Sequence, residues 1–237
     1  MQINSELCLG CAKCIKFCPM KAIEMENKKA IINQTLCAEC GVCHRLAVCE
    51  TNAFIPCVEL PWPRSLRSIF SDPVTIFQET GCSGRGTEEM KTNDVTNRFK
   101  DTKYVGIAVD VGRPNVGCSL KDVEKITRVL ALLGVEFEKL NPISYLMKDF
   151  NTGDLIEEVL DEKVISCVIE VLVPIANVPE VVDELKEVAK DIDTVFSIGI
   201  ICKVEKDLSI PVIPILEQRG YFVKPSAKTN IGLGKRI

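Results

Sequence analysis

Residues 8–18 read CLGCAKCIKFC, and residues 37–49 read CAECGVCHRLAVC. Each run places three cysteines at Cys-x2-Cys-x2-Cys spacing and adds a fourth cysteine after them. Three thiolates at this spacing, on a loop that winds around one point, can face one metal group from three sides. The fourth contact to that group must therefore come from elsewhere in the chain.

This spacing is that of iron–sulfur ligation, in which the fourth cysteine of each run completes the site built by the other run. Two other uses of cysteine fit less well. Disulfides need an oxidising compartment, whereas we find no secretory signal and an odd total of 13 cysteines. Structural zinc prefers separated Cys-x2-Cys pairs over triplets. We therefore expect iron–sulfur clusters.

Residues 1–60 resemble the bacterial two-cluster ferredoxins, since Pro19 follows Cys18 and Ala22-Ile23 follow in turn. The resemblance implies two 4Fe-4S clusters and a domain that covers residues 1–60. It implies that the first cluster is bound by Cys8, Cys11, Cys14 and Cys49, and the second by Cys37, Cys40, Cys43 and Cys18.

The second run departs from the family pattern. Five residues instead of three separate Cys43 from Cys49, and Glu50 stands where a proline is expected. Residues 51–54 then resume the register. We interpret the difference as a two-residue insertion in a loop and keep Cys49 as the ligand, with Cys57 as the alternative.

Composition narrows the classes of partner. The aromatic content of 5% and the net charge of −4 disfavour a nucleic-acid-binding surface. The longest apolar run, residues 164–178, contains Glu170 and Pro174 and is too short to span a bilayer. Since oxygen destroys exposed clusters, we expect a cytoplasmic protein of an anaerobic or well-reduced cell, with neither nucleic acid nor membrane as a partner.

Residues 20–36 alternate apolar and polar side chains around Asn27-Lys28, which predicts a β-hairpin between the cysteine runs. Residues 61–101 then predict a Gly-rich, polar linker or docking segment with a short strand at 74–77. The polar side chains of this segment, with two cysteines in Gly-Cys-Ser sequences, form a candidate ligand or partner surface: Arg85, Lys91, Asn93, Asp94, Cys82 and Cys118.

Residues 102–205 alternate strand and helix patterns. We expect strands at 104–112, 135–139, 164–173 and 194–204, with helices that begin at Ser119 and Asn177. This order, βαβ twice, predicts a four-stranded antiparallel sheet with two helices on one face. The fold class is therefore α+β, with a carboxy-terminal ferredoxin-like, ACT-like α/β sandwich. We expect an insertion at 142–162 with a short helix at 155–160.

The tail, residues 206–237, predicts one edge strand and ends in an incomplete phosphate-loop sequence, Gly232-Leu233-Gly234-Lys235. Of the remaining cysteines, Cys167 and Cys202 fall in predicted strands and are expected as small buried hydrophobes. Cys82 and Cys118 are either a reactive or metal-binding pair or cysteines that happen to lie in tight loops. The single histidine, His44, lies in the second run and is expected to tune a cluster rather than to bind it.

The favoured function is electron transfer, in which two clusters relay low-potential electrons to a redox partner protein or an enzyme complex docked by the carboxy-terminal domain. The alternative is an iron–sulfur oxidoreductase or activating enzyme with a substrate site between the domains, to which Arg113 would also contribute. A third class is an ACT-like ligand sensor with redox or structural clusters. An electron carrier or electron-transfer subunit is favoured over a stand-alone enzyme, and the carboxy-terminal domain is also a candidate homodimer surface.

Overall fold

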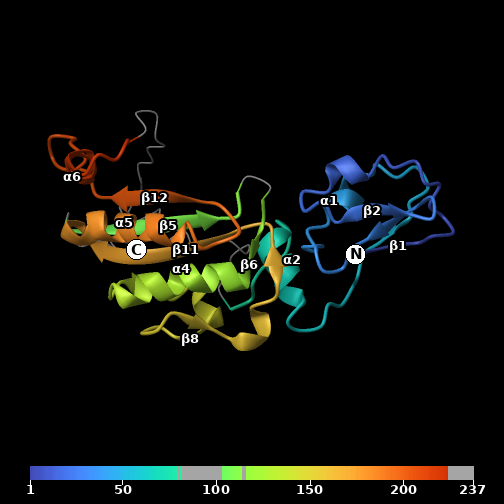
Figure 1. Ribbon diagram of the computed structural model, residues 1–237, viewed down its shortest axis with the longest axis horizontal. Coiled ribbons are helices and arrows are strands. Elements are labelled where there is room, and N and C mark those ends of the chain that lie inside the picture. The colour runs from blue at the N-terminus through green and yellow to red at the C-terminus, as the bar shows by residue number, and fades with distance from the viewer. Residues whose placement is uncertain (80, 82–102, 114–115, 224–237) are drawn as a thin grey trace.

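The structure is a computed structural model that describes residues 1–79, 81, 103–113 and 116–223. Figure 1 shows two bodies side by side, an amino-terminal domain with the cysteine runs and a larger carboxy-terminal domain built on a sheet. Helix α2 (Ser65–Ser71) lies between them. Among the described helices, none combines the length and the apolar character that crossing a bilayer requires.

The amino-terminal domain contains two small sheets joined by the cysteine loops. Its elements are β1 (Gln2–Ile3), the 3-10 helix η1 (Ile15–Phe17), β2 (Ile23–Glu26), β3 (Lys29–Ile32), α1 (Val42–Arg45) and β4 (Phe54–Ile55). Strand β1 pairs antiparallel with β4, and β2 with β3. Asn27 and Lys28 have φ of 48° and 63°, the left-handed conformation that a two-residue hairpin turn needs. The predicted hairpin is confirmed.

The apolar core of this domain is small. Its buried members are Met1, Cys8, Cys14, Ile23, Ala30, Ala53 and Phe54. Cys8 and Cys14 of the first run are part of this core, and cysteines of both runs pack against it: Cys18, Cys37, Cys43 and Cys49. So small an apolar core contributes little stability of its own.

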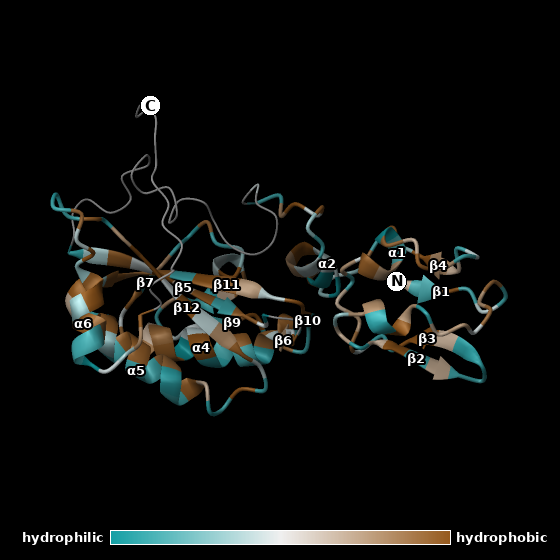
Figure 2. Cartoon of the chain, turned by 90° about the horizontal axis from the view of Figure 1, so that it is seen from above, coloured by the Kyte–Doolittle hydropathy of each residue, from teal (hydrophilic) through white to brown (hydrophobic). Residues whose placement is uncertain are grey.

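The carboxy-terminal domain is built on an antiparallel sheet with strand order β12-β5-β11-β7. The strands are β5 (Tyr104–Val111), β7 (Glu136–Phe137), β11 (Cys167–Pro174) and β12 (Phe196–Cys202). Helix α4 (Leu120–Leu132) connects β5 to β7, and α5 (Val178–Val188) connects β11 to β12. The two helices contact each other on one face of the sheet (Figure 2). The α+β class is confirmed, and the ACT-like assignment stays a prediction.

One face of this sheet supplies most of the core. In β5, Ile107 and Val109 are fully buried, and Val109 lies opposite Ile169 of β11. On α4, Ile126 and Leu130 lie one turn apart and are fully buried in the same cluster. Each such side chain contributes about 2 kcal/mol on burial. The alternate residues of β5 and β11 and the helically spaced residues of α4 therefore pack into one core.

Both predicted helix starts are confirmed. The hydroxyl of Ser119 accepts a hydrogen bond from the N–H of Asp122 at 3.1 Å, as an N-cap does. Helix α4 is followed by Gly134 at φ 66°, the left-handed conformation of a helix C-terminus. Helix α5 carries Pro179 in its first turn, where a missing N–H costs nothing.

The insertion differs from the expectation. Instead of a helix at 155–160 it forms a small hairpin and short 3-10 helices: η2 (Ser144–Leu146), β8 (Met147–Asp149), β9 (Asp154–Leu155) and η3 (Glu157–Val159). Strand β10 (Lys163–Val164) then pairs with β6 (Cys118–Ser119). The 3-10 helix η4 (Ile175–Asn177) leads into α5.

The segment after residue 60 also differs. Helix α2 occupies residues where we expected a linker, and its Leu66 and Phe70 are buried in the core of the carboxy-terminal domain. Residues 74–76 do not form the predicted strand, and Val74 and Ile76 are exposed. The apolar spacing of i and i+4 in α2 was hidden by the polar side chains around it.

The described part of the tail, residues 206–223, contains a helix and no strand. Helix α6 (Val212–Gln218) replaces the predicted edge strand, with Val212 and Leu216 buried one turn apart. The phosphate-loop-like residues 232–235 lie outside the described residues.

Candidate functional site

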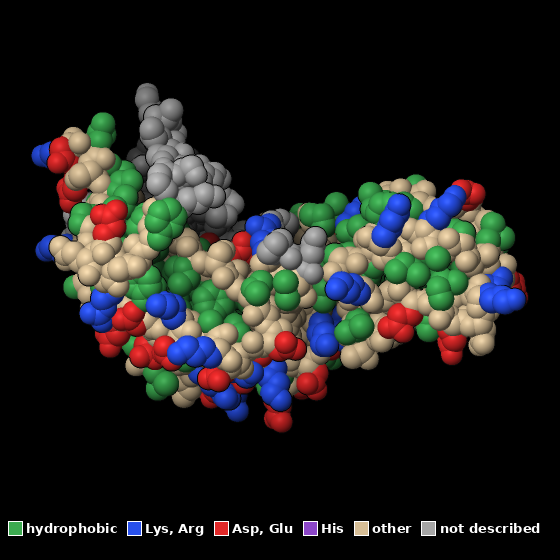
Figure 3. Space-filling view, turned by 45° about the horizontal axis from the view of Figure 1, so that its top comes forward, with side chains coloured by type: hydrophobic (Ala, Val, Ile, Leu, Met, Phe, Trp, Pro, Cys, Tyr) green, Lys and Arg blue, Asp and Glu red, His purple; other side chains and the backbone are tan. Residues whose placement is uncertain are grey.

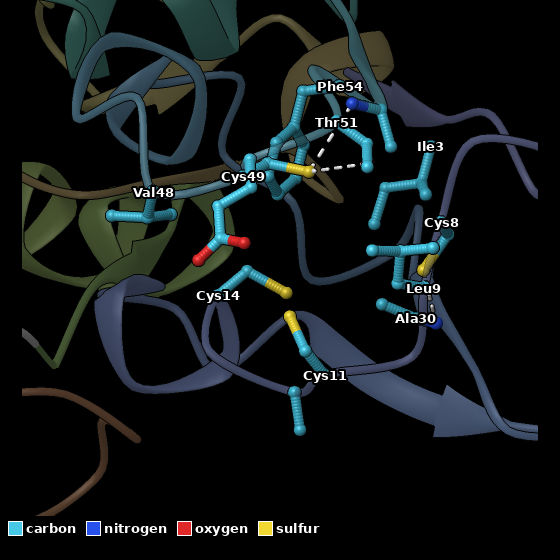
Figure 4. Close-up of a pocket in the computed structure, with 13 residues that line it drawn as sticks. Ile3, Cys8, Leu9, Cys11, Cys14, Ala30, Val48, Cys49, Thr51 and Phe54 are labelled. Atoms are coloured by element: carbon cyan, nitrogen blue, oxygen red, sulfur yellow. Dashed lines mark hydrogen bonds between the residues drawn. The ribbon is translucent and has the colours of Figure 1, made fainter.

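Cysteines from both runs line a first pocket, which we call site 1 (Figure 4). Cys8, Cys11 and Cys14 come from the first run, and Cys49 comes from the end of the second. Apolar side chains complete the wall, among them Ile3 and Phe54. The space between them is about 500 Å³, including the part open to solvent.

The other four run cysteines line a second pocket, site 2. Cys37, Cys40 and Cys43 come from the second run, and Cys18 comes from the end of the first. The space here is about 360 Å³ on the same measure. The structure therefore brings together the two sets of four cysteines that the ferredoxin resemblance implied, each with its fourth sulfur exchanged between the runs.

The two runs share a backbone conformation. Gly10 and Ala12 of the first run have φ of 70° and 59°, and Glu39 and Gly41 occupy the same places in the second run with φ of 53° and 66°. These left-handed residues wind each loop tightly enough for successive cysteines to face one pocket. At Gly10 a Cβ would lie 2.0 Å from the carbonyl oxygen of Lys28, so only glycine fits there.

The insertion before Cys49 is absorbed locally. Where the first run has η1, the second has the longer helix α1, followed by Ala47 at φ 48°. The register is then restored, since Lys21 and Asn52, each three residues after the fourth cysteine, have φ of 51° and 52°. This is why an extra pair of residues leaves the position of Cys49 intact.

Backbone N–H groups point at the cysteine sulfurs. Ala22 donates to Cys18 at 3.2 Å, and Ala30 donates to Cys8 at 3.4 Å. The hydroxyl of Thr51 contacts the sulfur of Cys49 at 3.5 Å, and this hydrogen bond lowers the pKa of that thiol. Hydrogen bonds of this kind stabilise negative charge on sulfur.

Four thiols of the two sites are harder to ionise. Burial raises the pKa of the Cys14, Cys37 and Cys40 thiols, and it raises the pKa of Cys43 to about 12. Neighbouring cysteines raise the pKa of Cys43 further, because thiolates that share a site repel one another. Such thiols become thiolates only when a bound cation compensates the charge, so binding must release protons.

The arrangement fits a cluster better than a single ion. Among the described residues, no three His, Cys, Asp or Glu side chains converge closely enough to hold one metal ion. The sulfurs instead stand around the walls of the two pockets. Four cysteine thiolates spaced around a cavity form the donor set of a 4Fe-4S cluster.

Two other residues of the cysteine region lie elsewhere. Cys57 and His44 line neither site 1 nor site 2 but a third cavity, between the amino-terminal domain and α2. We call it the junction cavity, and it encloses about 860 Å³ including its open part. Its polar wall also includes Glu39, Arg45 and Asp72. Cys49, rather than Cys57, therefore lines site 1.

The remaining predicted surface is only partly described. Arg85, Lys91, Asn93, Asp94 and Cys82 lie outside the described residues, and Arg113 forms an ion pair with Asp110 at 3.0 Å.

Cys118 lies in a short strand and is 4% exposed, not in an open loop. It contacts the buried thiol of Cys167, and this hydrogen bond and burial raise the pKa of Cys167 well above its ordinary value. The prediction that Cys167 is buried is confirmed, but its pairing with Cys118 was not foreseen, because the two residues meet only through the packing of the sheets. Cys202 is half-buried.

Sequence reasoning also missed Arg64, the N-cap of α2, and Arg67 within α2. Their guanidinium groups donate hydrogen bonds to residues 34–39, at the start of the second run. The only signal was the helical spacing of Leu66 and Phe70 after Pro63, which the polar residues around them hid.

Comparison with known proteins agrees with this geometry at the amino-terminal end. Residues 1–50 match the family described as the 4Fe-4S dicluster domain. The chain is 41% identical over 54 residues to an uncharacterized ferredoxin of Methanocaldococcus jannaschii, a stretch that makes up 22% of this chain and 84% of that relative. No solved structure matches the chain. Both likenesses lie in the amino-terminal domain.

Proposed function

The chain belongs, through its residues 1–50, to the family of 4Fe-4S dicluster domains, and on that premise we propose that it is an electron-transfer protein. We place one 4Fe-4S cluster in site 1 and one in site 2, where each supplies a one-electron couple when bound. The observation that carries the proposal is the pair of pockets, each lined by four cysteines with one contributed by the other run.

The residues around the pockets suit this role. The eight sulfurs would hold the clusters, and apolar side chains form much of the wall around each. The N–H groups of Ala22 and Ala30 stabilise charge on the sulfurs, which raises a reduction potential. The protein thus sets burial, spacing and hydrogen bonding, while the clusters supply the electron chemistry.

The two sites face different surroundings. Beside site 1, Cys11 is exposed and Leu9 is 72% exposed. Figure 3 shows apolar side chains interspersed with charged ones over the visible face of the amino-terminal domain. We propose that a redox partner docks over site 1, because exposed apolar side chains beside a cofactor offer a partner a surface to bury.

Site 2 lies toward the carboxy-terminal domain. Met20 lines site 2 and packs on Gly117, where an added Cβ would lie 2.5 Å from the Met20 Cε. Trp62 adds a hydrogen bond of 2.8 Å to Glu158 across the same junction. We propose that the carboxy-terminal domain, with its ferredoxin-like, ACT-like arrangement, docks this end of the relay to a further protein or enzyme complex.

Metal analysis of the anaerobically purified chain tests the proposal. Two sites require about eight irons and about eight sulfides per chain, because each cube holds four of each. A value of about four irons would reject one of the sites. Cys202→Ser is a suitable control, because Cys202 lies outside both pockets.

The junction cavity supports a second candidate function, an iron–sulfur oxidoreductase with a substrate site between the domains. The cavity borders the second run through Gly41 and His44 and contains the half-buried thiol of Cys57. Without its open part the cavity measures about 380 Å³, which is in the range of small-molecule sites. Alkylation of Cys57 tests this function, since a substrate bound in the cavity slows that reaction, whereas an unaltered rate with every candidate substrate argues for the carrier.

A further inference from the structure

One of the buried cations beside site 2 comes from outside the amino-terminal domain. Arg67 of α2 is 5% exposed, and its Nη1 donates to three backbone carbonyl oxygens: Gln34 at 2.9 Å, Thr35 at 3.1 Å and Cys37 at 2.8 Å. Cys37 is the first cysteine of the second run. The guanidinium thus rests on the loop that begins site 2.

The other side of the same guanidinium faces the carboxy-terminal domain. Its Nε donates to the carboxylate of Glu162, which is itself buried. A buried guanidinium is costly unless its donors are satisfied, and here carbonyls and a carboxylate satisfy them from two domains. Arg64, one turn earlier, adds hydrogen bonds to Gln34 and Glu39. The second loop is therefore held by α2.

Site 1 has an equivalent cation of local origin. Lys29, in the β2–β3 hairpin, donates to the carbonyl oxygen of Cys8 at 2.5 Å. Cys8 holds the same place in the first run that Cys37 holds in the second. Site 2 also has a local cation, since Nη2 of Arg45 donates to the carbonyl oxygen of Cys40 at 2.6 Å. At the first cysteine of each run, however, site 1 uses a lysine of its own domain, whereas site 2 uses an arginine whose helix packs in the carboxy-terminal core.

We propose that Arg67 is a positioning residue of site 2, through which the carboxy-terminal domain raises the reduction potential of that site. The proposal rests on the proposed function, since it takes site 2 to hold a cluster. A cation next to a ligand carbonyl favours the more negative, reduced state of the site, and its burial shields this effect from salt. By linkage, reduction at site 2 tightens the contact between the domains by the same factor.

Redox titration followed by electron paramagnetic resonance, on the anaerobically purified full chain, tests this role. Cys40→Ala identifies the site 2 signal as the one that is lost. Arg67→Met lowers the equilibrium constant of one-electron reduction at site 2 tenfold or more. This corresponds to a fall of about 59 mV or more in the site 2 potential. The site 1 potential is unchanged. Arg67→Lys, which keeps the charge, retains most of the site 2 potential.

Two further variants separate charge from packing. Glu162→Gln removes a negative charge beside Arg67 and raises the site 2 potential, opposite in sign to Arg67→Met. Lys29→Met is the matched control, because it shifts site 1 and leaves site 2 unchanged. If Arg67→Met and Glu162→Gln shift site 2 in the same direction, or neither shifts it, Arg67 serves only to pack the domains and the proposal is overturned.

Failure of the proposed electron relay and failure of the role of Arg67 give different results. A wild-type chain that holds iron only in site 1 overturns both the relay and the role of Arg67. Iron in both sites with an unchanged site 2 potential overturns the role of Arg67 alone. If Arg67→Met does not fold, Arg67→Lys and Glu162→Gln decide, because each keeps a polar partner in the buried junction.

Discussion

The backbone N–H of Ala53 donates a hydrogen bond to the sulfur of Cys49 at 3.3 Å. The same bond joins Ala22 to Cys18 at 3.2 Å, again four residues after the cysteine. The fourth cysteine of each run is therefore held in the same local structure, although two extra residues precede Cys49. This equivalence places Cys49, and not Cys57, in site 1.

Replacement of Cys49 by Ala should remove the site 1 cluster and lower the iron content from about eight to about four per chain. Cys57→Ala should leave the iron content unchanged, because Cys57 lines the junction cavity. Iron and sulfide analysis of anaerobically purified variants measures both. Loss of iron in Cys57→Ala, with full iron in Cys49→Ala, would show that Cys57 and not Cys49 is the cluster ligand.

Removal of iron with a chelator should unfold residues 1–60 and leave the carboxy-terminal domain folded. The first domain has a small apolar core of which cysteines are part, whereas the second has an extended core of its own. Amide hydrogen exchange reads the two domains separately. Protection that persists in β2 and β3 after iron removal would show that the amino-terminal fold is independent of metal.

Phe70→Ala on α2 should destabilise the carboxy-terminal domain by about 3–5 kcal/mol, because Phe70 is 2% exposed in that core. Leu132→Ala is the control: Leu132 is 84% exposed, and its loss should change stability by about 0.5 kcal/mol or less. Urea unfolding followed by far-ultraviolet circular dichroism gives both values. Equal effects of the two substitutions would mean that α2 is not part of this core.

Asp122→Asn should reduce the acid sensitivity of the carboxy-terminal domain. Burial acts to raise the pKa of Asp122, but hydrogen bonds from Lys125 and Ser119 outweigh it and hold the pKa below its usual value. A depressed pKa stabilises the fold above about pH 4 and this contribution is lost as the pH falls through the folded-state value.

The measurement is the urea midpoint of the wild type and the Asn variant at neutral and at acidic pH. The wild type should lose more stability than Asp122→Asn on acidification. An identical loss in both would show that Asp122 does not contribute to the acid transition.

Features set by short-range spacing could be predicted from the sequence. The grouping of Cys18 with the second run, the turn at Asn27-Lys28 and the cap at Ser119 all depend on residues close in the chain or on a repeated pattern. The α+β class followed from the alternation of strand and helix signals in the same way.

Features set by long-range packing could not be predicted from the sequence. Arg67 looked like one polar residue of a linker, and only the fold brings it to Glu162, 95 residues away. The pairing of Cys118 with Cys167 likewise depends on how β6, β10 and β11 are arranged. Helix α6 was missed because only the fold shows that Val212 and Leu216 pack on the carboxy-terminal core.

The exchange of the fourth sulfur is tested most directly by Cys18→Ala. Each run's fourth cysteine lines the pocket of the other run, so this change should abolish the site 2 signal in electron paramagnetic resonance and keep that of site 1. Cys40→Ala marks the site 2 signal, and Cys11→Ala marks that of site 1. Loss of the site 1 signal in Cys18→Ala, with site 2 intact, would mean that each run closes its own site and would contradict the exchange.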